Sequence, residues 1–175
     1  NVQFDWTRRI LGGAVPAKHF LDHFHLGSNV FSDVHGRILE FDPATNKMRS
    51  YLEGGIDEAD SATILSNPDG NAIQTFDGVD YLIINEDIDW FDRGRVPEYV
   101  TAAQRFINEV YFLPLNKQEP QRSDLMRFAI GPKGSETTGT YFTPDGKTMF
   151  LNIQHPWPRN KPPFNRSCTV AITGF

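Results

Sequence analysis

The stretch Thr137–Pro156, TTGTYFTPDGKTMFLNIQHP, contains two apolar runs separated by a group of turn residues. The turn residues are Pro144–Lys147, which read PDGK. Proline presets a turn dihedral and glycine accepts a positive φ, so this chemistry favours a tight reversal of the chain. The stretch therefore predicts a β-hairpin, in which one strand ends at Phe142 and the other covers Met149–Ile153.

Similar patterns of strands and turns recur along most of the chain, which predicts an all-β protein. A segment with a different pattern, Val96–Phe106, has Pro97 near its start and predicts a short helical insertion. The further strands expected from the pattern are Gly36–Phe41, Met48–Leu52, Asn71–Phe76, Tyr81–Asn85, Glu109–Leu113, Leu125–Ile130 and Ser167–Ile172.

The hairpins form a repeat. The turn Asp77–Gly78 and its following strand line up with Asp145–Gly146 and the strand after it. Repeated strand pairs are typical of a β-propeller, in which about 4–8 blades surround a central axis. The strands suffice for a partial propeller, so we expect residues 35–175 to form its C-terminal blades and residues 1–34 to dock on them. The remaining sheet surfaces are then covered by the rest of the propeller or by another protein chain.

The composition excludes some classes of function. The net charge of -5 argues against a nucleic-acid surface, which needs a basic stripe. The longest apolar runs fall short of the roughly 18 residues of a membrane span, so we expect a protein that does not cross a membrane. The one cysteine, Cys168, excludes an internal disulfide, and its place in an apolar strand predicts a buried, inert thiol.

Acidic residues stand at the ends of two expected strands. Glu86 and Asp87 directly follow an apolar strand, and Glu136 precedes another. A carboxylate at the end of a buried strand is costly unless it faces water, a cation or a metal. Because inner strands of different blades converge on one axis, Glu86 and Glu136 could share a hard ion such as Ca²⁺. The residues alone leave open that these acids belong to a solvated turn and an exposed loop.

A second group of candidate metal ligands is His19, His23 and His25. On a helix His19 and His23 would share a face, and a zinc site requires three or four such ligands. The intervening Phe20 and Phe24 fit an amphipathic packing segment equally well, so this alternative stays open.

Three segments together resemble the C-terminal portion of the PhoX-type alkaline phosphatase family. Gly36–Thr45 is similar to the family's hairpin G-x-I-x-x-[YF]-D-P-A-T, and Asn67–Asp87 is similar to its P-D-N…G…L-x-x-x-E-D element. Gly131–Pro156 is similar to G-P-x-G-x-E-x-T-G…F-T-P-D-G-x-T-x-F-x-N-x-Q-H-P, and this motif is long and specific.

The resemblance implies a β-propeller with iron and calcium ions at its centre, which hydrolyses phosphate monoesters outside the cytoplasm. The family's metal ligands include its Glu-Asp pair and the Glu of E-x-T-G. Carried over to this sequence, these ligands are Glu86, Asp87 and Glu136. The resemblance assigns no catalytic residue to this chain.

The chain also departs from the family pattern. The family's metal-binding Cys and further acidic ligands lie in upstream blades that this sequence lacks, and Cys168 does not stand in their place. These departures favour a rival reading, in which the chain is a non-catalytic, propeller-derived binding or assembly subunit of a larger complex. A third reading, a sugar-lactonase-like propeller, shares the generic turns but does not match through Gln154–Pro156.

Overall fold

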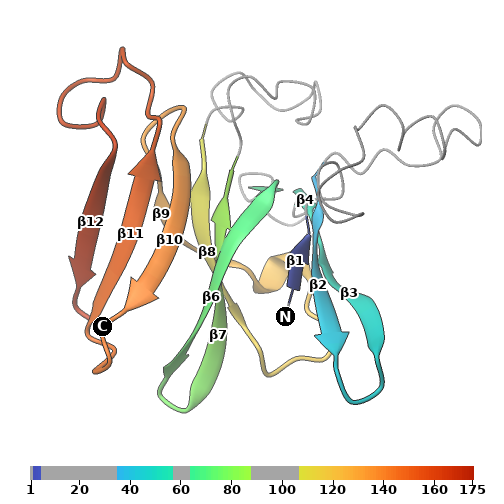
Figure 1. The fold of residues 1–175 in the computed structure, drawn as a ribbon. Helices are drawn as coiled ribbons and strands as arrows, with labels where there is room; N and C mark the ends of the chain where they lie inside the picture. The colour runs from blue at the N-terminus through green and yellow to red at the C-terminus, as the bar shows by residue number, and fades with distance from the viewer. Residues whose placement is uncertain (1, 5–34, 57–63, 88–106) are drawn as a thin grey trace, which may run out of the picture.

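The computed structural model describes residues 2–4, 35–56, 64–87 and 107–175, and the fold is given for these residues (Figure 1). They form antiparallel strands and one 3₁₀ turn, so the predicted all-β class is confirmed. The elements are β1 (Val2–Phe4), β2 (Arg37–Asp42), β3 (Lys47–Glu53), β4 (Gly55–Ile56), β5 (Ile64–Leu65), β6 (Pro68–Phe76), β7 (Val79–Glu86), β8 (Glu109–Pro114), η2 (Arg122–Asp124), β9 (Met126–Ile130), β10 (Glu136–Phe142), β11 (Thr148–Gln154) and β12 (Cys168–Thr173).

The predicted hairpin with the turn Pro144–Lys147 forms between β10 and β11. The carbonyl of Thr143 accepts the N–H of Gly146 at 2.8 Å, and Gly146 adopts a φ of 68°. The carboxylate of Asp145 accepts the N–H of Lys147 at 3.2 Å, which satisfies a donor that the turn leaves unpaired. The β6–β7 hairpin turns at Asp77–Gly78, as its repeat relation to β10–β11 predicts.

Three main sheets lie side by side with their faces packed together (Figure 1). Their strand orders are β1-β2-β3, β6-β7-β8-β9 and β10-β11-β12, and β4 and β5 form a small separate pair. Neighbouring strands within each sheet pair antiparallel. This succession of small antiparallel sheets is the arrangement of propeller blades.

Two apolar layers hold the sheets together. One lies between the first and middle sheets and includes Ile38, Leu52, Leu82 and Ile84. The other joins the middle and last sheets, and its buried members are Ile83, Val110, Phe112, Phe142, Met149, Leu151 and Ile153. Successive residues of β7 enter opposite layers, because side chains alternate along a strand. The middle sheet is therefore buried on both faces.

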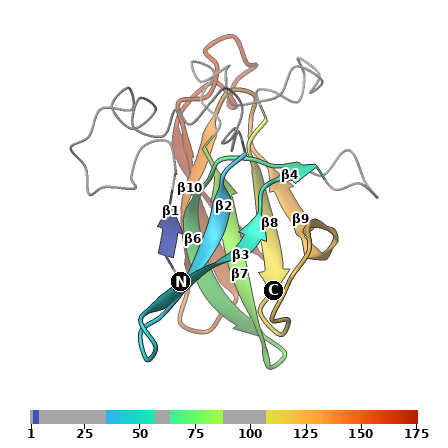
Figure 2. The same cartoon turned by 90° about the vertical axis from the view of Figure 1, so that its right-hand side faces the viewer.

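The first strands of the three main sheets, β1, β6 and β10, lie toward one another. Strand β10 packs against β6 and β7, and β1 packs against β6. Figure 2 shows β1, β6 and β10 toward the same side of the stack. Residues at corresponding ends of these strands are thus brought close together despite their separation in sequence.

Several predictions concern residues that the structure does not describe. The expected helix Val96–Phe106 and the histidine group lie outside the described residues, as does the N-terminal segment up to residue 34 except for β1. The prediction that Cys168 is buried is wrong. The residue is exposed, because Cys168 is the first residue of β12, the outermost strand of the last sheet within the described part of the chain. Within the described ranges, no helix is long and apolar enough to cross a bilayer.

Candidate metal centre

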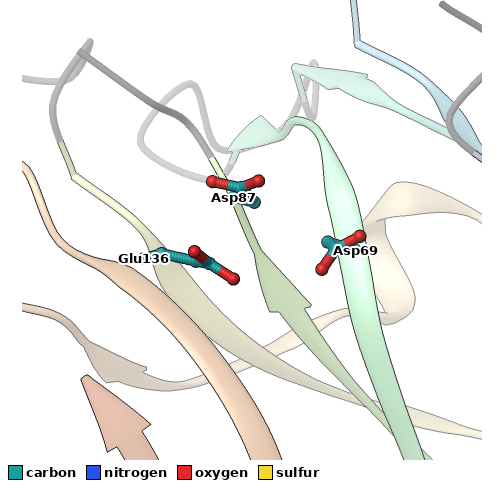
Figure 3. A group of neighbouring side chains, drawn as sticks. All are labelled: Asp69, Asp87 and Glu136. Atoms are coloured by element: carbon teal, nitrogen blue, oxygen red, sulfur yellow. The ribbon is translucent and has the colours of Figure 1, made fainter. Parts of the chain in front are cut away.

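Three carboxylates from different strands lie together at one end of the middle and last sheets. Asp69, Asp87 and Glu136 each offer an oxygen atom, and these atoms all lie within 4.8 Å of one another. All three side chains are half-buried. Figure 3 shows them directed toward a common space, with Glu136 opposite Asp69 and Asp87 between them.

The strand arrangement explains why these residues meet. Asp69 is the second residue of β6, Asp87 directly follows β7, and Glu136 begins β10. The carbonyl of Asn67 accepts the N–H of Asp87 at 3.0 Å, which ties the start of β6 to the end of β7. Because β10 packs against both strands, its first residue is placed beside these two ends.

Glu86 lies apart from this group, although it precedes Asp87 in the chain. Its carboxylate accepts the N–H of Ser66 at 2.7 Å and the N–H of Glu109 at 2.9 Å. The side chain is 1% exposed. Burial raises the pKa of the Glu86 carboxyl well above its ordinary value, and the nearby Glu109 raises it further. Glu86 thus joins β5, β7 and β8 from inside the protein.

A polar network continues from Glu86 into the first apolar layer. Glu109 accepts hydrogen bonds from the hydroxyl of Tyr111 and, at 3.2 Å, from Nη1 of Arg127. Burial is the main cause that raises the pKa of the Tyr111 hydroxyl. Buried polar groups of this kind are stable only when their hydrogen bonds are made. The network thereby connects the end of β7 to the start of β8.

The geometry of the three carboxylates fits a hard divalent cation. Ca²⁺ binds oxygen ligands at about 2.3–2.6 Å, so two ligands of one ion lie up to about 5 Å apart. The oxygens of Asp69, Asp87 and Glu136 satisfy this limit. Like charges at such separations repel one another unless a cation compensates them. Carboxylate oxygens are the donors that Ca²⁺, Mg²⁺ and Mn²⁺ prefer.

The structure brings together two of the three residues expected from the sequence, Asp87 and Glu136, and adds Asp69. The prediction missed Asp69, although it stands in the P-D element that carries part of the family resemblance. Strand alternation could also have predicted that Glu86 points into the protein, because it places Glu86 on the same face of β7 as the buried Leu82 and Ile84. Asp87 follows on the opposite face.

Comparison with known proteins identifies a family to which the chain is similar. A family model described as alkaline phosphatase PhoX matches residues 26–157, a segment that contains all three carboxylates. The chain belongs to the PhoX alkaline phosphatase family. The PhoX resemblance of the sequence motifs is thereby confirmed.

A solved PhoX structure supports the same assignment. The chain is similar to Pseudomonas fluorescens PhoX in complex with vanadate, a transition state analogue, with a TM-score of 0.56 and 26% sequence identity. The match covers 80% of this chain and 26% of that chain, so the sequence spans about a quarter of its PhoX relative. A search of curated proteins gave no match.

Proposed function

We propose that this chain supplies part of the metal centre of a PhoX phosphatase that hydrolyses phosphate monoesters. The observation that carries the proposal is the meeting of Asp69, Asp87 and Glu136 at one end of the sheets in a member of a metal-dependent family. In this proposal the three carboxylates hold a cation, and Glu86 belongs to the buried network that supports them.

The charges of the three residues explain why a cation is needed. Asp69, Asp87 and Glu136 together repel a phosphate dianion when they are ionised and uncompensated. A bound divalent cation supplies a positive centre that binds phosphate oxygens and neutralises charge developing in the transition state. The carboxylates fix the position of that centre relative to the sheets, and β6, β7 and β10 fix the carboxylates.

We propose Ca²⁺ for this group, because its ligands are carboxylate oxygens without nitrogen or sulfur among the described residues. The iron ions implied by the family resemblance remain a prediction. They would require ligands beyond the three carboxylates, and the family's metal-binding Cys has no counterpart at Cys168.

We propose that the complete enzyme contains further propeller blades. The sequence spans 26% of Pseudomonas fluorescens PhoX, so the remaining blades and ligands are proposed to come from the rest of the propeller. PhoX proteins are generally secreted, and an extracytoplasmic location is proposed here too. The vanadate complex of the relative leads us to expect that vanadate inhibits the enzyme.

A phosphomonoesterase assay tests this function against the rival binding or assembly role. The full-length protein is assayed with p-nitrophenyl phosphate before and after treatment with EGTA, and after Ca²⁺ is returned. The proposal expects activity that is lost on chelation and restored by Ca²⁺, and that the substitution Asp87→Asn greatly reduces. Asp80→Asn is the matched control, because Asp80 is an exposed acid near the start of β7, the strand that Asp87 directly follows. A pure, folded protein that is inert under every metal condition would support the non-catalytic role instead.

A further inference from the structure

Thr137 makes a polar connection between the last and middle sheets. Its side chain is fully buried, and its hydroxyl oxygen accepts the N–H of Glu86 at 3.2 Å. The same oxygen lies 3.2 Å from the carbonyl of Glu86 and 3.3 Å from the carbonyl of Glu109, so its proton can be donated to either. One hydroxyl thus joins β10 to the backbones of β7 and β8.

The position of this connection is next to two members of the carboxylate group. Thr137 directly follows Glu136, and Glu86 directly precedes Asp87. The hydroxyl therefore links the backbone segments that carry Glu136 and Asp87. Among the described residues, no strand of one sheet pairs with a strand of the other, so such side-chain bonds and apolar packing set their separation here. A second bond between the sheets, from Thr140 Oγ1 to Asn85 Oδ1 at 2.9 Å, involves no backbone atom.

We propose that Thr137 is a positioning residue for the cation site, whose hydroxyl fixes the separation between Asp87 and Glu136. This inference rests on the proposed cation site of the preceding section. Thr137 itself is buried in the protein interior, and we do not propose it as a ligand. It acts through the backbone, by holding the segments that carry Asp87 and Glu136 at a fixed separation.

The expected effect follows from how metal sites depend on their supporting contacts. Ligand oxygens must be held within about 0.5 Å of their productive positions, and residues that hold them matter nearly as much as the ligands. Loss of such a partner typically lowers metal affinity about 10–100-fold. We expect the same range when the Thr137 hydroxyl is removed.

The test compares three variants of the full-length protein after its metal has been removed. Thr137→Val removes the hydroxyl at nearly constant volume, and Thr137→Ser keeps it. The matched control is Thr143→Val, because the Thr143 hydroxyl also accepts a backbone N–H, that of Thr148 at 3.1 Å, at the other end of the same hairpin. Calorimetric titration with Ca²⁺ is expected to show about 10–100-fold weaker binding for Thr137→Val, and wild-type affinity for the other two variants.

A second readout separates positioning from a loss of stability. Tb³⁺ replaces Ca²⁺ in oxygen-ligand sites, and its luminescence lifetimes in H₂O and D₂O report the number of bound waters. If Asp87 and Glu136 move apart in Thr137→Val, water replaces a lost carboxylate oxygen and the number of bound waters rises. A purely structural role would lower the melting temperature without changing this number.

The results distinguish the positioning role of Thr137 from the existence of the cation site. Wild-type affinity in Thr137→Val, or weak binding in Thr137→Ser, overturns the positioning role while the cation site stands. A wild-type protein that binds neither Ca²⁺ nor Tb³⁺ overturns the site itself, and the positioning role with it. If Thr137→Val fails to fold, Thr137→Ala removes the hydroxyl without adding a methyl group, and the Thr137→Ser result still decides.

Discussion

The carboxylates of Glu86 and Asp87 face different surroundings although the residues are neighbours in the chain. Glu86 accepts backbone N–H groups of Ser66 and Glu109 inside the protein, whereas Asp87 joins Asp69 and Glu136 at the strand ends. Alternation along β7 separates the two side chains. Glu86 thus connects strands inside the protein, whereas Asp87 is one of the three carboxylates that we propose bind a cation.

Because Glu86 accepts two buried N–H groups, replacing it should lower the free energy of unfolding. In Glu86→Gln, one of the two buried N–H groups faces an amide NH₂ in place of an acceptor oxygen. An unsatisfied buried donor costs about 1–3 kcal/mol, so the free energy of unfolding should fall by that amount. Urea denaturation of the metal-free protein measures it.

The control for this substitution is Glu53→Gln, which removes an acid paired with Arg37 at 3.1 Å on the surface. The Glu53 side chain is 49% exposed, and exposed ion pairs contribute about 0–1 kcal/mol. If Glu86→Gln were no more destabilising than Glu53→Gln, the proposed internal role of Glu86 would be wrong.

Gly139 provides a second prediction, because both its backbone and its surroundings exclude a side chain. It has a φ of 64°, and an added Cβ would lie 2.4 Å from Nδ2 of Asn152. Asn152 is itself held, since its Oδ1 accepts the hydroxyl of Thr169 at 2.6 Å. Gly78 also has a positive φ of 78°, but nothing lies within 4 Å of its Cβ position.

Gly78→Ala therefore isolates the backbone cost, which is about 1–2 kcal/mol for a left-handed residue. Gly139→Ala adds the steric cost and should destabilise the protein by clearly more than Gly78→Ala. Thermal denaturation of the two variants provides the comparison. Equal melting temperatures would show that Asn152 moves aside freely, contrary to this account.

Asp124 gives a prediction about pH. The N–H of Gln121 at 2.9 Å, and then Lys117, lower the pKa of the Asp124 carboxyl below its ordinary value of 3.8. A lowered pKa means that the folded protein binds fewer protons than the unfolded chain, so the stabilisation exists above pH 3.8 and is lost as pH falls through the lowered pKa.

The substitution Asp124→Asn should thus cost about 1 kcal/mol near neutral pH and progressively less in acid. Urea denaturation of both proteins over a series of pH values measures the difference in unfolding free energy. A difference that stays constant down to the acid end of the series would contradict the assigned ionic contacts of Asp124.

The second apolar layer is expected to contribute strongly to the free energy of unfolding, because it joins the last sheet, which carries Glu136, to the middle sheet. Phe142 is 7% exposed, and its ring lies 5.5 Å from that of Phe76 and 5.3 Å from that of Phe175. Phe142→Ala is expected to lower the unfolding free energy by about 3–5 kcal/mol. Phe164→Ala, at a position 60% exposed, is the control and should have little effect. Similar denaturation midpoints for the two variants would argue against this packing.

Much of the fold could be predicted from the sequence, because turn chemistry is local. The Asp77–Gly78 and Pro144–Lys147 turns, with the apolar runs beside them, predict the β6–β7 and β10–β11 hairpins that the structure contains. The short strands β1, β4 and β5 were not predicted. They have two or three residues each, too few to show alternation, and pairing with a partner strand rather than local preference forms them.

The carboxylate group was harder to predict, because it depends on which way individual side chains point. Pairing between β6 and β7 shifts register between Pro68 and Asn71, so alternation cannot be followed back through this bulge to Asp69. For Glu86, the family resemblance suggested a ligand, whereas the structure shows a side chain engaged with Ser66 and Glu109. The approach of Glu136 depends on packing between sheets, which sequence pattern alone does not specify.

The most direct measurement of the central claim is anomalous diffraction from crystals of the full-length protein soaked with Tb³⁺. The account predicts an anomalous peak at ligand distance from the carboxylates of Asp69, Asp87 and Glu136, which Asp87→Asn weakens and Asp80→Asn leaves intact. Tb³⁺ bound elsewhere in the wild-type protein, with the space between these three side chains devoid of any peak, would contradict it.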